Sequence, residues 1–157
     1  MPELIKEFDY YADLDAPHAV GPGPFGQRIL AYVTGGECSG DRLKGTLVAG
    51  SGADWLLAGP DGFGRLDVRV TIKTVDGALI YLQYVGGLLE MTPAIMAAVS
   101  GSTDTLTNFG EQYFFTSPRL ETGDDRYAWV NQTMFVGEGR IVPGPRVEFR
   151  VYRVANS

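Results

Sequence analysis

The sequence predicts an all-β protein that folds as one closed antiparallel β-barrel with a single short helix. Apolar and polar residues alternate with a period of two in segment after segment, as they do in strands with one buried face. Turn residues separate these segments, and 21 glycines and nine prolines in 157 residues favour many short elements. A closed barrel is preferred to a sandwich because closure removes the edges that so many strands would expose.

Eight segments combine this alternation with β-branched and aromatic residues, which favours strands. In Arg65–Lys73 every second residue from Leu66 to Ile72 is apolar, and Asp67 and Arg69 fall on the opposite face. The eight expected strands, in chain order, are Leu4–Leu14, Gln27–Gly35, Leu43–Ala49, Arg65–Lys73, Ala78–Val85, Gln112–Arg119, Arg126–Val136 and Arg146–Val154.

Turn and cap residues define the remaining elements. Asp76-Gly77 stands between two expected strands and predicts a hairpin with the positive φ angles of a type I′ turn. Thr92 as N-cap and Pro93 at the first helical position predict one short helix over Thr92–Val99, which Gly101 ends. The length suggests one domain spanning residues 1–157.

Composition narrows the classes of function. A net charge of −6 disfavours nucleic acid and anionic membranes as partners. The N-terminus has no targeting pattern and no segment is apolar enough to span a bilayer, so we expect a cytoplasmic protein. One histidine and one cysteine exclude multi-histidine and cysteine-rich metal sites. Residues 21–26 spell the glycine pattern of a dinucleotide fingerprint, but prolines interrupt it and a strand follows. We therefore expect neither metal nor cofactor.

The single histidine and the single cysteine of the sequence are interpreted as structural residues. His18 lies in an expected surface loop, and Cys38 lies in an expected turn with no basic neighbour to activate its thiol. Both are interpreted as catalytically inert, with a thiolate nucleophile at Cys38 as the alternative.

What remains is the chemistry of carboxylate, arginine, tyrosine and tryptophan side chains. Asp54 precedes Trp55 after a Gly-Ser-Gly bend, and Asp67 and Arg69 share one strand face. If these faces converge in a barrel interior, a desolvated aspartate has a raised pKa and serves as a general base near neutral pH. Arg and Tyr donors would then stabilise an oxyanion. The alternative is a solvated surface pair worth under about 1 kcal/mol.

Several of these residues lie in motifs that resemble a known family. The motifs include Gly52-Ala53-Asp54-Trp55, Leu66-Asp67-Val68-Arg69, Ser117-Pro118-Arg119-Leu120-Glu121-Thr122 and Tyr127-Ala128-Trp129-Val130-Asn131. They resemble, in order and over nearly the whole chain, the uncharacterised protein family catalogued as domain-of-unknown-function family number 3237. The resemblance implies a calycin-like (lipocalin-like) β-barrel with a central cavity, and it implies almost nothing about a reaction.

The leading hypothesis is a cofactor-independent enzyme, an isomerase, cyclase or lyase, that moves a proton on a small carbonyl or aromatic compound in the barrel interior. The expected catalytic residues are Asp54, Asp67 and Arg69. The expected ligand-binding residues are Arg28, Trp55, Tyr84, Tyr113, Arg119, Glu121, Trp129 and Asn131. Two alternatives stay open, a non-catalytic carrier and a structural barrel that docks a protein partner; a cavity under about 300 Å³ would favour the structural barrel.

Polar residues in the interior would turn the apolar face from Leu66 to Ile72 outward, where it would need cover. One short helix cannot cover all of it, so the sequence predicts a homodimer that buries this face.

Overall fold

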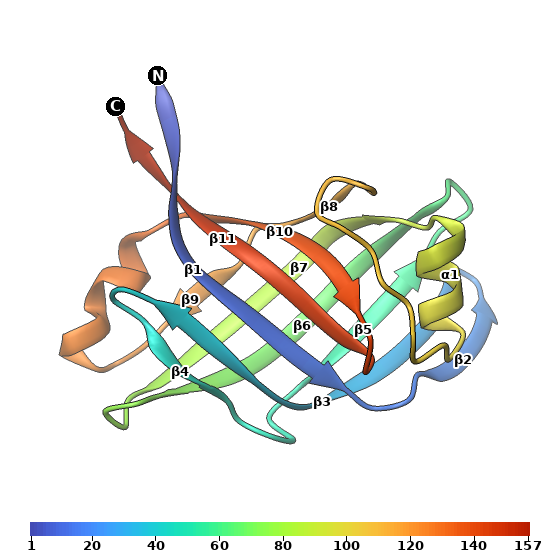
Figure 1. Ribbon diagram of the computed structural model, residues 1–157, viewed down its shortest axis with the longest axis horizontal. Coiled ribbons are helices and arrows are strands. Elements are labelled where there is room, and N and C mark those ends of the chain that lie inside the picture. The colour runs from blue at the N-terminus through green and yellow to red at the C-terminus, as the bar shows by residue number, and fades with distance from the viewer.

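The computed structural model describes residues 1–157 as one sheet of eleven strands with two short helices (Figure 1). The strands are β1 (Pro2–Leu14), β2 (His18–Gly23), β3 (Gly26–Gly40), β4 (Lys44–Leu47), β5 (Ala53–Ala58), β6 (Phe63–Thr74), β7 (Leu79–Glu90), β8 (Phe114–Thr116), β9 (Arg119–Glu121), β10 (Phe135–Val142) and β11 (Arg146–Asn156). The helices are α1 (Pro93–Val99) and the 3₁₀ helix η1 (Asp125–Gln132). The expectation of a mostly β chain with at least eight strands is confirmed.

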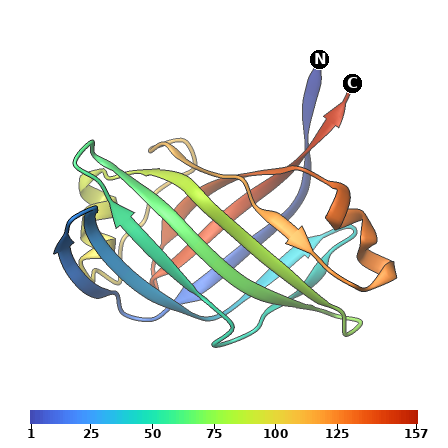
Figure 2. The ribbon, with the colours of Figure 1, turned by 180° about the vertical axis from the view of Figure 1, so that it is seen from behind.

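The sheet is ring-like. Its strands pair in the order β6-β5-β3-β1-β11-β10-β8-β7, and β7 pairs back with β6, so that the path returns to its start. The β6–β7 ladder is long, from Phe63 opposite Glu90 to Lys73 opposite Leu79. Figure 2 shows β5, β6 and β7 side by side on the rear wall of the molecule. Because the sheet curves round, each strand has an inner face and an outer face.

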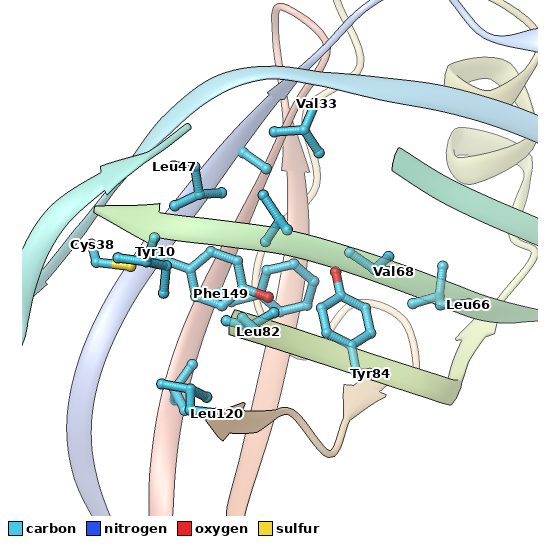
Figure 3. Packing of buried hydrophobic residues seen from close by; sticks show 14 of the residues in the cluster. Tyr10, Val33, Cys38, Leu47, Leu66, Val68, Leu82, Tyr84, Leu120 and Phe149 are labelled. Carbon is cyan, nitrogen blue, oxygen red and sulfur yellow. The ribbon is translucent and has the colours of Figure 1, made fainter. Parts of the chain in front are cut away.

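Apolar side chains fill the inner face. Leu66, Val68, Val70 and Ile72 are all buried, and they belong to one core cluster with residues from the opposite wall such as Phe149. Figure 3 shows side chains from several strands meeting in this interior. The expectation that this face of β6 points outward is therefore wrong: only the interior lets all the strands bury their apolar faces together. The physical reason for expecting a homodimer disappears with it.

Helix α1 forms where the sequence predicts it. The side chain of Thr92 accepts a hydrogen bond from the Ile95 backbone N–H at 3.4 Å, and Pro93 begins the helix. Ile95 and Ala98 are buried, and α1 lies at one end of the ring (Figure 1). Neither helix has the length and apolar character that crossing a membrane requires.

The expected strand Arg126–Val136 is wrong over most of its length. Asp124 caps η1 by accepting the Arg126 backbone N–H at 3.0 Å, and β10 begins only at Phe135. Tyr127 and Val130 are the buried residues of η1, and their spacing of three suits a 3₁₀ turn. Helix η1, the orange coil in Figure 1, lies at the end of the ring opposite α1.

Two local differences concern turns and short strands. Gly77 has a φ of +92°, but Asp76 does not have a positive φ, so the β6–β7 turn is not the expected type I′. The glycine-rich run from Gly21 lies in the β2–β3 hairpin, in which Gly23 pairs with Gly26. Strands β2, β5 and β9 have no counterpart among the eight expected strands. Strand β2 is rich in glycine and proline, β5 has no β-branched residue, and β9 is only three residues long.

Candidate functional site

An interior cavity of about 80 Å³ lies inside the ring, toward the end that α1 covers. Its walls come from strands on all sides of the ring and from Ala98 and Val99 of α1. Almost all of the lining side chains are aliphatic or aromatic. Three polar side chains line it, namely those of Asp15, Asp54 and Tyr84.

Strand register places Asp54 and Tyr84 on the same inner wall. Asp54 of β5 lies opposite Val68 of β6, and Val68 lies opposite Tyr84 of β7. Neighbouring strands are about 4.8 Å apart, so the backbones of Asp54 and Tyr84 are about 10 Å apart across Val68. Both side chains line the cavity from there.

Among the carboxyl groups of the molecule, that of Asp54 has the pKa furthest from its ordinary value. Its Oδ1 is shielded from solvent and has no hydrogen-bond partner. Burial is the main cause that raises the pKa of Asp54 from 3.8 to about 7; the backbone amide of Asp67 opposes the rise, and the negative charge of Asp67 adds to it. A carboxyl group of this pKa exists in both protonation states near neutral pH, as a general acid–base catalyst requires.

Two buried tyrosines adjoin this carboxyl group. Burial raises the pKa of Tyr84 and of Tyr10, and the charge of Asp54 adds to the effect on both. Figure 3 shows both phenol rings inside the ring, Tyr84 beside Val68 and Tyr10 beside Phe149. Tyr10 stacks on Phe149 with ring centroids 4.9 Å apart. Both phenols therefore stay protonated at neutral pH, and the Tyr10 hydroxyl has no hydrogen-bond partner in the protein.

Asp15 and Pro17 lie in the partly exposed segment between β1 and β2 and line the end of the cavity that we take as its mouth. One carboxylate oxygen accepts the Tyr32 backbone N–H at 2.7 Å, and the other lies 3.2 Å from Nε2 of His18. The His18 ring also packs edge-on against Tyr32. The charge of Asp15 thus has partners, in contrast to that of Asp54.

The other two expected catalytic residues lie outside the cavity. Arg69 is exposed on the outer face of β6. Asp67 lies on the same face and is partly buried, with its Oδ1 shielded from solvent and unpartnered. The Asp67 backbone amide and the Asp67 charge both act on the pKa of Asp54, which lies on the neighbouring strand β5. Asp67 therefore affects the pKa of Asp54 from the outer face of the sheet, and its side chain does not line the cavity.

Most of the expected ligand-binding residues also lie on the outside. Trp55 and Tyr113 are 43% and 50% exposed, and Arg28 donates to the Trp55 carbonyl oxygen at 3.1 Å. The guanidinium of Arg42 lies 3.8 Å over the ring of Trp129 in η1.

Three expected residues do gather, but in a separate place. Arg119, Glu121 and Asn131 line an open polar groove between β7, β9 and η1. Asn131 is tied there to the backbone of Thr122, accepting its N–H at 2.8 Å and donating to its carbonyl oxygen at 2.9 Å. Of the expected ligand-binding residues, only Tyr84 lines the interior cavity.

Sequence reasoning missed Asp15 and Tyr10. The period-two pattern of Phe8, Tyr10 and Ala12 in β1 is the signal that identifies Tyr10, since all three are buried. No local signal identifies Asp15, because its place at the mouth depends on Tyr32 in the next long strand.

The two lone residues are accounted for by their surroundings. Cys38 is buried, and burial raises the pKa of its thiol to about 12, which removes the thiolate that a nucleophile needs. His18 begins β2 and is exposed, rather than lying in a loop. No group of three or more histidine, cysteine, aspartate and glutamate side chains is placed to hold a metal ion.

Fold and cavity together define the class: a small ring-like β-protein with an unpaired carboxyl group in an apolar interior. The chain belongs to the family described as protein of unknown function (DUF3237), whose pattern matches residues 2–154. It is 31% identical over 139 residues to a UPF0311 protein of Clostridium acetobutylicum, covering 84% of this chain and 85% of the relative. It is 30% identical over 115 residues to a UPF0311 protein of Rhodopseudomonas palustris, 71% of each chain.

Solved structures resemble the whole chain. A conserved protein of unknown function from Rhodopseudomonas palustris has a TM-score of 0.86 at 27% identity and covers 99% of both chains. A beta-barrel like protein from Acinetobacter baumannii has a TM-score of 0.78 at 28% identity, covering 99% of this chain and 97% of that one. A protein from Penicillium herquei described as an enzyme has a TM-score of 0.66 at 19% identity, covering 98% and 95%, and shares the fold alone.

Proposed function

We propose that this protein is a calycin-like β-barrel that binds a small, partly apolar carbonyl compound in its interior and moves a proton on it, with Asp54 as the general base. The observation that supports this proposal is the unpartnered Oδ1 of Asp54 in an apolar cavity, with a pKa of about 7. An unsatisfied buried polar group costs stability, so its retention calls for a role. A ligand that contacts Asp54 provides one.

The reaction class follows from the two polar groups on the inner wall. The Asp54 carboxylate removes a proton from the carbon next to a carbonyl group, and the C–H electron pair passes into an enolate. The Tyr84 hydroxyl donates a hydrogen bond to the developing oxyanion in a site of low dielectric. In a substrate with a C=C bond between the β- and γ-carbons, the enolate is conjugated with that bond. Protonated Asp54 then returns the proton to the γ-carbon, and the C=C bond moves into conjugation with the carbonyl group, so that the substrate is isomerised without net uptake or release of protons. No arginine lines the cavity, and Tyr84 takes the role that the sequence assigned to Arg69.

The volume limits what the interior holds. A cavity of about 80 Å³ is far below the roughly 300–1,000 Å³ of pockets for drug-sized ligands. It is also smaller than the roughly 150 Å³ cavity that accepts benzene. The ligand therefore places only its reacting end beside Asp54, and its remaining atoms extend toward the mouth at Asp15 and Pro17. The same small volume favours a second candidate, a structural barrel with a packed interior.

Deuterium exchange tests the proposal without knowledge of the natural substrate. Butanone, which is smaller than benzene, is incubated with the protein in D₂O, and deuterium incorporation is followed by mass spectrometry. We expect the protein to catalyse exchange and Asp54→Asn to slow it about a hundredfold or more, the usual contribution of a general base. Asp61→Asn is the matched control, because it removes an exposed carboxylate that pairs with Arg65 on the outside.

The outcomes separate the candidates. Equal exchange with the wild type and Asp54→Asn overturns the catalytic role. Butanone that perturbs the NMR signals of Val68 and Leu66 without exchange identifies a carrier. Butanone that perturbs neither residue identifies a packed structural barrel.

A further inference from the structure

The charged groups that line the cavity restrict the class of substrate that the proposed function allows. Asp54 and Asp15 are the only charged side chains that line the cavity, and both are acidic. No lysine, arginine or histidine lines it, and neither does any amide side chain. The remaining polar side chain, Tyr84, is a phenol whose pKa is raised by burial.

The basic residues near the mouth are already engaged. His18 lies 3.2 Å from the carboxylate of Asp15. Arg146, next to the lining residue Pro145, binds Asp13 at 2.7 Å and lies 3.8 Å over the ring of Tyr11. Neither side chain is free to follow a negatively charged ligand inward.

We infer that the cavity excludes carboxylates and other anions, and that among neutral ligands it binds most tightly those that carry a hydrogen-bond donor. A carboxylate beside ionised Asp54 is a like-charge contact in a medium of low dielectric, which is unfavourable. The Oδ1 of Asp54 has no hydrogen-bond partner within the protein, so a ligand that carries a donor satisfies it. The inference rests on the proposed interior site, but it concerns binding and not the proton transfer.

Isobutyramide and isobutyrate form a matched pair of probes. They have the same number of heavy atoms and the same branched apolar body; the amide is neutral and donates, whereas the carboxylate is charged and only accepts. The apparent Kd of each is measured at pH 8, where Asp54 is mostly ionised, from methyl NMR shifts of Val33, Val68 and Leu66. We expect isobutyramide to bind at least about tenfold more tightly.

The Asp54→Asn variant replaces a negatively charged hydrogen-bond acceptor by a neutral group that can donate. It removes the negative charge and supplies an N–H donor in nearly the same shape, so isobutyrate should bind as tightly as isobutyramide or more tightly. Asp61→Asn, on the outside, should leave the wild-type preference unchanged. The wild-type comparison stands even where the Asp54 variant fails to fold.

Each result decides something different. Equal affinities for the two probes, or a preference for isobutyrate, overturn the charge selectivity and leave the proposed proton transfer standing. Shifts from neither probe show that the interior does not admit a ligand, which overturns both proposals. A preference for isobutyramide with no butanone exchange supports the selectivity and overturns only the catalytic role.

Discussion

The stability of the Asp54→Asn variant relative to the wild type should increase as the pH rises. The folded carboxyl group holds its proton up to about pH 7, whereas the unfolded one releases it near 3.8. Between these values the folded state binds more protons, so the wild type loses stability as the pH increases. The full shift corresponds to at most about 4 kcal/mol, of which about 3 kcal/mol develops between pH 4.5 and 8. Asparagine does not titrate, so the free energy of unfolding of the variant has no such dependence on pH at this position.

Urea unfolding of both proteins at several pH values measures the effect. The difference in unfolding free energy should move in favour of Asp54→Asn by about 3 kcal/mol from pH 4.5 to 8. The cost of burying the asparagine amide adds a constant offset and leaves this change with pH untouched. A difference that stays flat with pH, or one that moves in favour of the wild type, would refute the raised pKa and with it the acid–base role.

Asp61→Asn provides the control for that experiment. Hydrogen bonds from Arg65 lower the pKa of Asp61 to about 2, so its stabilising contribution is complete above pH 4 and is lost only as the pH falls toward 2. The stability difference for this variant should therefore be independent of pH between 4.5 and 8. A slope like that of Asp54→Asn would point to a change in the unfolded state instead.

The remaining predictions concern packing and exposure. Gly52→Ala should destabilise by at least about 3 kcal/mol in urea unfolding, because its Cβ would lie 1.6 Å from the Arg69 carbonyl oxygen. Gly35→Ala, which meets nothing within 4 Å, should change stability by less than about 0.5 kcal/mol, and equal effects would contradict the close approach. Cys38 should react with a thiol reagent only after unfolding, and rapid labelling of the native protein would contradict its burial. Arg69→Met should alter neither the melting temperature nor isobutyramide binding, since its side chain is exposed on the outer face; a loss of binding would return Arg69 to the site.

The sequence alone determined the strands and the helix that short stretches of residues specify. Alternation in Arg65–Lys73 located β6, and Thr92 with Pro93 located α1, because burial of one face and helix capping act within a few residues. Motifs over nearly the whole chain were sufficient to recognise the family. The sequence also named Asp54 as one of three expected catalytic residues, and it is the one of the three that lines the cavity. Local pattern failed at Arg126–Val136, where the cap at Asp124 turns an apparent strand into a 3₁₀ helix.

Only the tertiary structure decided which face of each strand is inside. Alternation separates Val68 from Arg69 but does not say which of them meets the far wall, since that depends on how the strands round the ring bury their apolar faces together. The ring turned Leu66 and Val68 inward and left Arg69 in solvent. It also raised the pKa of Asp54, because the groups that bury this carboxyl come from strands distant in sequence, brought beside it by strand pairing.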